Sequence, residues 1–316
     1  MNTRPFNRWA LSRALTRIAN ASPTELAQRP LPEPSQHLAR RIGVTGAPGS
    51  GKSTLVGHLA LERLHRGRLG VLAIDPSSPH SGGAILGDRV RMDDLSGSEQ
   101  LYIRSLGSRK TNDGLADNLP EMLDLMDQFE FDEVILETVG VGQAEYAVRN
   151  QVNTLVLVLL PDSGDMVQAM KAGIMELADI FVVNKADLPG AQRAATDLRR
   201  IATVMKRAPH EWTPPILLAA SSQPESVQAL SRAIDKHQEW QATAHQAQVQ
   251  RLQRARYRLK RVAELRIAQA MARSEDVFFD APLAEQLARL FDAVRVPIVP
   301  ATEIRPVSAD PGRQGS

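Results

Sequence analysis

The sequence RIGVTGAPGSGKST, from Arg41 to Thr54, contains a phosphate-binding pattern. It joins a short apolar run, Ile42 to Thr45, to a glycine-rich turn that ends in Lys52 and Ser53. An amphipathic stretch, Leu55 to His65, follows. A strand, the pattern G-x-x-x-x-G-K-[ST] and a helix in this order are typical of a P-loop, whose backbone N–H groups surround bound phosphates. The order predicts a nucleotide-binding α/β domain.

Seven short apolar runs alternate with helix-length amphipathic stretches from Arg40 onward. The runs are Ile42–Thr45, Val71–Ile74, Leu101–Ile103, Val134–Leu136, Thr154–Leu160, Ile180–Val183 and Ile216–Ala219. This alternation indicates crossover connections and a mostly parallel sheet that is covered on both faces. The predicted fold class is therefore α/β, a doubly wound and mostly parallel sheet carrying the P-loop, with helical extensions at both ends.

The chain is predicted to have four parts. They are an N-terminal helix and linker (1–38), the P-loop domain (39–240), a helical region (241–307) and a disordered tail (308–316). Helical spacing of apolar residues predicts helices over Phe6–Ala19, Gln248–Arg273 and Leu283–Val294. The four prolines of Pro23–Ser35 predict a linker after the N-terminal helix.

Charge and composition exclude several classes of protein. Lys and Arg number 38 against 36 Asp and Glu, which gives a formal charge of +2. Such a balance argues against nucleic acid or a membrane surface as partner. No apolar run reaches the roughly 18 residues that span a bilayer. The chain has no cysteine, so any metal must be held by oxygen or imidazole. We therefore expect a cytoplasmic protein.

The glycine-rich turn predicts a site for the phosphates of a nucleotide. Glycines allow the backbone N–H groups to turn inward, and the start of a helix favours an anion. Lys52 is expected to reach the β- and γ-phosphates, and the Ser53 hydroxyl is expected to ligate Mg²⁺. The candidate phosphate-binding residues are Gly46, Ala47, Pro48, Gly49, Ser50, Gly51, Lys52, Ser53 and Thr54.

The run Asn-Lys-Ala-Asp after the strand Ile180–Val183 predicts selectivity for guanine, because it resembles the tetrad shared by most P-loop GTPases. The Asp187 carboxylate can accept hydrogen bonds from guanine N1–H and the exocyclic amine, whereas adenine has an acceptor at N1 and no amine. A short run after the last strand lies where such proteins make a backbone contact to the guanine oxygen. The candidate base-binding residues are Asn184, Lys185, Asp187, Ala220 and Ser221. GTP and GDP are the expected ligands.

Acidic and amide side chains between these motifs predict a magnesium and catalytic site. Glu137 closes a strand at the place where P-loop proteins hold Mg²⁺ through an acid. The Gly140 N–H and the Gln143 amide are expected near the γ-phosphate. Asp75 and Asp88 share a long loop, although Asp88 could instead cap the helix that follows. The candidate catalytic residues are Lys52, Asp75, Asp88, Glu137 and Gln143, and the candidate metal ligands are Ser53, Asp75, Asp88 and Glu137.

Together these motifs resemble those of the MeaB/ArgK-type P-loop GTPases, the chaperones of methylmalonyl-CoA mutase and related cobalamin-dependent acyl-CoA mutases. The matching stretches are Gly43–Thr54, Ile74–Met92, Glu137–Glu145, Asp165–Asp179 and Asn184–Asp187. The resemblance implies that Mg²⁺-dependent GTP hydrolysis gates adenosylcobalamin loading, protection or reactivation of such a mutase. It also implies a homodimer formed through helices outside the P-loop domain. Departures from the family pattern occur at Asp162, Arg109–Gly114 and Gln223–Ser226.

Two other functions remain as alternatives, a nickel-delivering GTPase and an ATP-dependent kinase or transport ATPase. The predicted selectivity of Asp187 for guanine argues against the ATP-dependent group. His58 and His65 lie seven residues apart without neighbouring carboxylates, so we expect them to be surface or packing residues rather than metal ligands. The basic run Arg251–Arg261 is expected to be a solvated or dimer-rim face of a helix whose apolar side includes Leu252 and Leu259.

Overall fold

The computed structural model describes residues 6–28, 37–76, 98–108, 118–138, 143–161, 173–204, 211–242 and 244–295. The described residues of 1–19 and 35–255 form one compact unit, and those of 20–34 and 256–316 form a second. The predicted boundaries of the four parts stay predictions. No helix among the described residues is long and apolar enough to cross a membrane.

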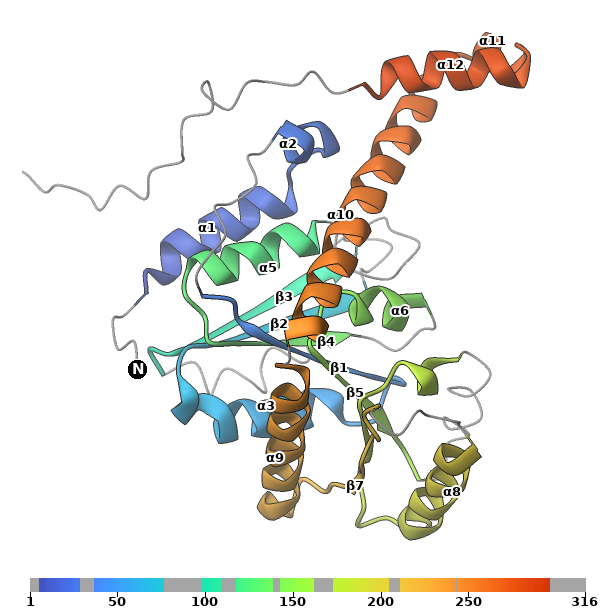
Figure 1. The fold of residues 1–316 in the computed structure, drawn as a ribbon. Helices are drawn as coiled ribbons and strands as arrows, with labels where there is room; N and C mark the ends of the chain where they lie inside the picture. Colours follow the sequence, from blue (N-terminus) through green and yellow to red (C-terminus); the bar gives the residue numbers. More distant parts are fainter. Residues whose placement is uncertain are drawn as a thin grey trace, which may run out of the picture. The chain divides into compact units, whose positions relative to one another are not determined.

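A seven-stranded sheet lies at the centre of the larger unit (Figure 1). All paired strands are parallel, in the order β3-β2-β4-β1-β5-β6-β7. The strands are β1 (Arg40–Gly46), β2 (Leu69–Pro76), β3 (Leu101–Ser108), β4 (Glu133–Thr138), β5 (Thr154–Leu159), β6 (Ile180–Val183) and β7 (Ile216–Leu218). Each strand corresponds to one of the seven apolar runs, so the predicted doubly wound α/β class is confirmed.

Helices cover both faces of this sheet. α3 (Lys52–Arg63) and α9 (Pro224–Gln241) lie on one face, where side chains of β1, β5 and β6 pack against Leu59 and Ile234. α8 (Ala191–Val204) packs against the alternate side chains of β5 and β6 on the other face. Because both faces are covered, every residue of β4 and β5 is buried, and their apolar runs show no alternation with polar residues.

The predicted N-terminal helix is present as α1 (Arg8–Ala19) and belongs to the larger unit. Its buried side chains, at helical spacing, are Leu11, Leu15 and Ile18. Asn118 precedes α5 (Leu119–Gln128) and donates from Nδ2 to the carbonyl oxygen of Ile18 at 2.7 Å. α1 is therefore packed against the P-loop domain through α5.

Helix α2 (Pro23–Gln28) lies inside the segment that was expected to be a proline-rich linker. Its start is a capping box: Glu25 N–H donates to Ser22 Oγ at 3.2 Å, and Ser22 N–H donates to Glu25 Oε2 at 2.6 Å. The bond from the Ser22 backbone lowers the pKa of the Glu25 carboxyl. Pro23 is compatible with this helix because a first-turn residue needs no N–H.

The remaining described elements are η1 (Leu64–Arg66), α6 (Gln143–Arg149), η4 (Ile174–Glu176), α10 (Ala244–Ala272), α11 (Asp276–Phe279) and α12 (Leu283–Ala293). α10 and α12 confirm the two helices predicted in the C-terminal region. The predicted tail, 308–316, lies outside the described residues.

Two residues of the predicted apolar side of α10 are exposed within this chain. Leu252 is 47% exposed and Leu259 is 73% exposed. Arg254 instead points inward and donates to Asn153 Oδ1 at 3.1 Å. Burial, and secondarily the charge of Arg41, lowers the pKa of Arg254 to about 9. The reason is that α10 meets the polar start of β5, where Asn153 also donates to the Gln250 side chain at 2.8 Å.

Candidate nucleotide-binding site

The sequence motifs gather at one edge of the sheet. In a parallel sheet the carboxyl ends of all strands lie on the same edge. The glycine-rich turn follows β1, Glu137 is near the end of β4, Asn184 follows β6, and Ala220 comes shortly after β7. Ligands of doubly wound sheets bind outside this edge, so the fold brings the candidate phosphate and base residues together.

The glycine-rich turn has a backbone that only glycine permits at its two ends. Gly46 has a φ of 148°, and a Cβ there would lie 2.1 Å from the carbonyl oxygen of Val158. Gly51 caps α3 with a φ of 84°, and its Cβ would lie 2.5 Å from Nδ2 of Asn184. The tight approach of the turn to β5 and to the base motif thus explains both glycines.

Lys52 begins α3 and is buried, with 7% of its surface exposed. Its Nζ donates to the carbonyl oxygen of Ala47 at 2.8 Å. The ammonium therefore lies over the turn between Gly46 and Gly51, where the sequence placed the phosphates. A buried ammonium at the start of a helix matches the charge of a phosphate chain.

Ser53 and Glu137 meet although 84 residues separate them. The Ser53 hydroxyl donates to Glu137 Oε1 at 2.6 Å. The Glu137 residue is buried, with 7% of its surface exposed, at the end of β4. A hydroxyl and a carboxylate are hard oxygen donors, and Mg²⁺ prefers such ligands. The pair fits a Mg²⁺ ion beside the phosphates.

Asn184 connects the base motif to the phosphate motif. Its Nδ2 donates to the carbonyl oxygen of Ser50 at 2.7 Å, and the residue is buried. Lys185 follows with a φ of 52°, a conformation that is uncommon outside glycine. The backbone N–H of Ala186 donates to the Ala219 carbonyl at 2.9 Å. Asp187 is exposed at the end of this turn, where its carboxylate is accessible to a base.

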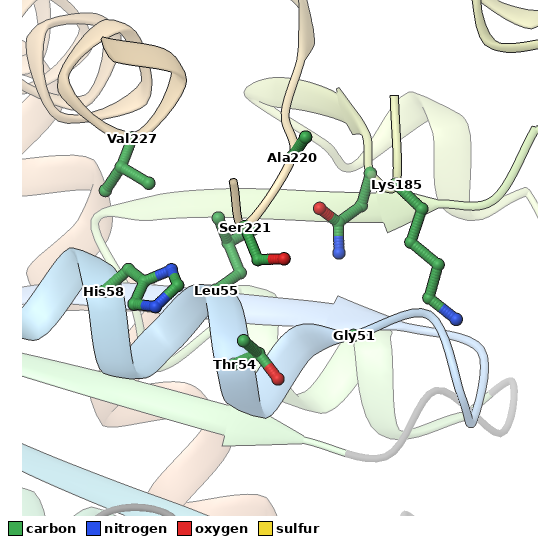
Figure 2. Close-up of a pocket in the computed structure, with 9 residues that line it drawn as sticks. Gly51, Thr54, Leu55, His58, Lys185, Ala220, Ser221 and Val227 are labelled. Carbon is green, nitrogen blue, oxygen red and sulfur yellow. The ribbon is translucent and has the colours of Figure 1, made fainter. Parts of the chain in front are cut away.

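A pocket opens between these motifs (Figure 2). It is lined by Gly51, Thr54, Leu55, His58, Asn184, Lys185, Ala220, Ser221 and Val227. Six of the candidate site residues are among them, which places the phosphate-side helix α3 and the loop after β7 on walls of the same pocket.

The pocket includes a residue that lies outside the sequence motifs. His58, which was expected to be a surface or packing residue, is partly buried and lines the pocket together with Thr54. The two residues are four apart on α3, so they lie on the same face of the helix. The four-residue spacing from Thr54 was the sequence signal that could have indicated His58 as a lining residue. The three-residue spacing of Leu55 and His58 likewise places them on adjacent parts of one wall. His58, Leu55 and Val227 are the lining residues that the motifs did not indicate.

The loop after β7 is held by Ser226, which stands in one of the stretches that depart from the family pattern. The backbone N–H of Ala220 donates to Ser226 Oγ at 3.3 Å. The hydroxyl of Ser226 donates to the Gln223 carbonyl at 2.6 Å. Because the Ala220 N–H already has this partner, a guanine oxygen would compete with Ser226 for it.

Several candidate residues cannot be placed. Asp88 and Gly140 lie outside the described residues, as do Asp162 and Arg109–Gly114. Asp75 is near the end of β2 and Gln143 begins α6, but their side chains are outside the described part of the chain. Within the described ranges, no group of three or more His, Asp or Glu side chains is arranged to hold a metal ion.

The chain matches known proteins along most of its length. The sequence model of the family described as "Methylmalonyl Co-A mutase-associated GTPase MeaB" matches residues 11–276. A Caulobacter vibrioides protein named "Putative GTPase" is 38% identical over 304 residues, which cover 94% of this chain and 91% of that protein. The Mus musculus protein named "Methylmalonic aciduria type A homolog, mitochondrial" is 37% identical over 196 residues, which cover 60% of this chain and 47% of that protein.

A solved structure shares the fold. The crystal structure titled "LAO/AO transport system kinase" superimposes with a TM-score of 0.63 and 23% sequence identity, and it covers 90% of this chain and 98% of its own. The family match over residues 11–276 extends beyond the nucleotide motifs into α1 and α10. The relatives that match over this length are named GTPases. The chain therefore belongs to the MeaB family and is a P-loop GTPase, an enzyme that binds guanine nucleotide and hydrolyses GTP.

Proposed function

We propose that this GTPase is a chaperone of a cobalamin-dependent acyl-CoA mutase, and that its GTP cycle gates adenosylcobalamin loading, protection or reactivation of that mutase. The observation that carries the proposal is the family match over residues 11–276, which includes helices outside the nucleotide site. The name of the mouse relative, a methylmalonic aciduria protein, supports the same client class.

The proposed reaction is attack of water on the γ-phosphorus of GTP, with GDP as the leaving group. Lys52 would hold the β- and γ-phosphates, and Ser53 and Glu137 would hold Mg²⁺, which would neutralise charge on the phosphate oxygens. The residues proposed to complete the metal and water site are Asp75, Asp88 and Gln143. Gly140 is proposed to sense the γ-phosphate through its N–H.

The base is proposed to lie in the pocket between α3 and the loop after β7. Asp187 accepts from the N1–H and the amine of guanine, and Asn184 fixes the base motif to the P-loop through the Ser50 carbonyl. The same bond couples the two halves of the site, since a shift of the P-loop backbone would move the tetrad. GTP and GDP carry the same base, so the site is proposed to distinguish them at the phosphates.

Slow GTP hydrolysis by the protein alone is expected, because the nucleotide motifs contain no arginine placed to stabilise the transition state. We propose that the mutase orders the loops that carry Asp75 and Asp88 and thereby speeds the reaction. Under this proposal the client changes the positions of groups that the GTPase already has, and catalysis arises from positioning and charge stabilisation.

GTP hydrolysis by the purified protein should accelerate when its client mutase is added. The measurement is phosphate release with GTP, alone and with each candidate acyl-CoA mutase from the same genome. Acceleration of roughly tenfold or more by one mutase is expected if ordering the site lowers the barrier by about 1.4 kcal/mol. The Lys52→Ala variant with the same mutase shows how much release comes from contaminating enzymes.

The two alternatives are tested in the same assay. Faster turnover of ATP than of GTP would support a kinase or transport ATPase, and stoichiometric nickel binding that changes turnover would support a metal-delivering GTPase. GTPase activity that no mutase changes would contradict the chaperone proposal. It would not contradict the assignment of GTP binding and hydrolysis.

A homodimer through the C-terminal helices is also proposed. α12 has an apolar face that nothing in the described part of the chain buries: Leu283 is 69% exposed, Leu287 is 43% exposed and Phe291 is 60% exposed. These residues are four apart, so they lie along one side of the helix. A continuous apolar face of this kind is typical of a protein–protein interface.

Replacing both Leu283 and Phe291 by glutamate should convert the dimer into a monomer. Two charges on the apolar face cannot be buried without partners, which costs several kcal/mol. Light scattering after size exclusion distinguishes 34.6 kDa from twice that mass. Ala288→Glu, an exposed position of the same helix outside this face, is the matched control and should stay dimeric. A monomeric parent protein would contradict the proposal.

A further inference from the structure

We infer that His58 contributes to recognition of the base: its imidazole donates a hydrogen bond to the O6/N7 edge of guanine. This inference rests on the nucleotide site proposed above and adds a residue that the sequence motifs of that site do not include. His58 stands on α3, and the helix begins in the P-loop itself. A contact from this helix would connect base recognition to the phosphate site by a second route, besides Asn184.

The first observation that supports the inference is the position of His58. It lines the same pocket as Thr54, Ser221 and Asn184. Figure 2 shows His58 and Thr54 on the α3 side of this pocket, with Ser221 on the loop across from them. The residue is partly buried, so its ring is held on the wall of the pocket and still faces open space.

The orientation of the base follows from the other groups. Asp187 is proposed to take the N1–H and the amine, and it does not line this pocket. Ala220 and Ser221, which do line it, were predicted to lie beside the guanine oxygen. The part of the base that enters the pocket is therefore the O6/N7 edge, and His58 shares that side with the loop after β7.

The chemistry of that edge suits an imidazole. Guanine presents two acceptors there, O6 and N7, whereas adenine presents the N7 acceptor and an amine donor. A neutral imidazole has one N–H donor. Within the described residues, the His58 ring takes part in no hydrogen bond or ion pair, so the donor is available to a ligand.

The surroundings also limit the alternatives. Leu55 and Val227, the two large apolar side chains of the lining, contribute to the same pocket as His58. A hydrogen bond made there is less exposed to competition from solvent than one at the open side near Asp187. A metal site is not indicated, because a single imidazole without carboxylate neighbours makes no ligand set.

The test compares four diphosphates in wild-type protein and in His58→Leu, which removes the donor and keeps an apolar side chain of similar length. They are GDP, 6-thio-GDP, 7-deaza-GDP and IDP. The second and third change only the acceptors O6 and N7, and IDP lacks only the amine that Asp187 reads. Dissociation constants are measured by calorimetry at one pH and salt concentration.

We expect GDP to bind wild-type protein about 3- to 10-fold more tightly than at least one of the two edge analogues, the size of one net hydrogen bond. His58→Leu should weaken GDP binding by a similar factor and remove that difference between GDP and the analogue. The ratio of IDP to GDP affinity should not change. His58→Gln, which keeps an N–H donor, should restore part of the difference.

Equal weakening of all four nucleotides in His58→Leu would mean a packing role and would overturn the inference, as would unchanged GDP affinity. Failure of the base site itself is detected separately. If Asp187→Asn keeps the wild-type ratio of GDP to IDP affinity, the base does not contact Asp187 and the site proposal is wrong, whatever the His58 variants show.

Discussion

Asp187→Asn should bind GDP about 100- to 1,000-fold more weakly than the wild-type protein does. The carboxylate is expected to accept two hydrogen bonds from guanine, and bonds to a charged group contribute about 1.5–3 kcal/mol each. An asparagine amide keeps one acceptor, but its NH₂ would face the guanine amine, donor against donor. Calorimetric titration with GDP measures the loss.

The same variant should gain affinity for XDP. Xanthine has a carbonyl at C2 where guanine has an amine, so the asparagine NH₂ finds an acceptor there while its carbonyl still accepts from N1–H. A preference for XDP over GDP is therefore the expected reversal. Asp197→Asn is the matched control, because it makes the same chemical change on α8 at an ion pair with Arg200, away from the pocket. Unchanged GDP affinity in Asp187→Asn would refute the assignment of this residue.

Lys52→Ala should lose about 100-fold or more in affinity for GTP and GDP. The ammonium is buried at the turn and bonds to the Ala47 carbonyl. In the nucleotide complex it is proposed to form charge-assisted bonds to two phosphate groups, each stronger than a neutral hydrogen bond. The rate of GTP hydrolysis should fall together with the affinity, because the same positive charge stabilises the transition state.

The control for Lys52→Ala is Lys236→Ala, an exposed lysine on α9. Both variants lose one positive charge from the chain, so a general electrostatic effect would appear in both. Thermal unfolding of the two proteins without nucleotide should differ little from wild type, which separates lost binding from lost folding. Wild-type nucleotide affinity in Lys52→Ala would place the phosphates elsewhere.

The strands could be predicted from the sequence because each is buried on both faces. A parallel strand buried on both faces is mostly apolar without alternation, so the central residues of β4 and nearly all of β5 stand out as continuous apolar runs. The glycines of the P-loop could be predicted for a related reason: the turn requires backbone angles that other residues rarely adopt. Both features, the apolar strands and the glycine-rich turn, leave a recognisable pattern in a short stretch of sequence.

Helix α2 shows where a local rule was applied too broadly. Prolines predicted a linker, yet Pro23 occupies the first turn of a helix, where it is favoured. The capping pair of Ser22 and Glu25 is a sequence signal that would have corrected the prediction. This error belongs to the interpretation of the sequence, since no tertiary contact was needed to avoid it.

The inward side of α10 could not be predicted in the same way. Leu252 and Leu259 have the spacing of an apolar side, but both are exposed. The surface that the helix contacts presents Asn153, which forms hydrogen bonds with Arg254 and Gln250. The side of a helix that is buried depends on its neighbour as well as on its own sequence. Only packing reveals the neighbour.

The sequence alone determined the fold class, the P-loop and the base motif, because each depends on a short run of residues with a fixed local geometry. Tertiary structure decided which distant residues share the site. It brings Ser53 to Glu137 at 2.6 Å, Asn184 to the Ser50 carbonyl at 2.7 Å, and His58 into the pocket that Asn184 and Ser221 line. These contacts depend on the order of the strands in the sheet. That order follows from the packing of the whole sheet rather than from any one motif.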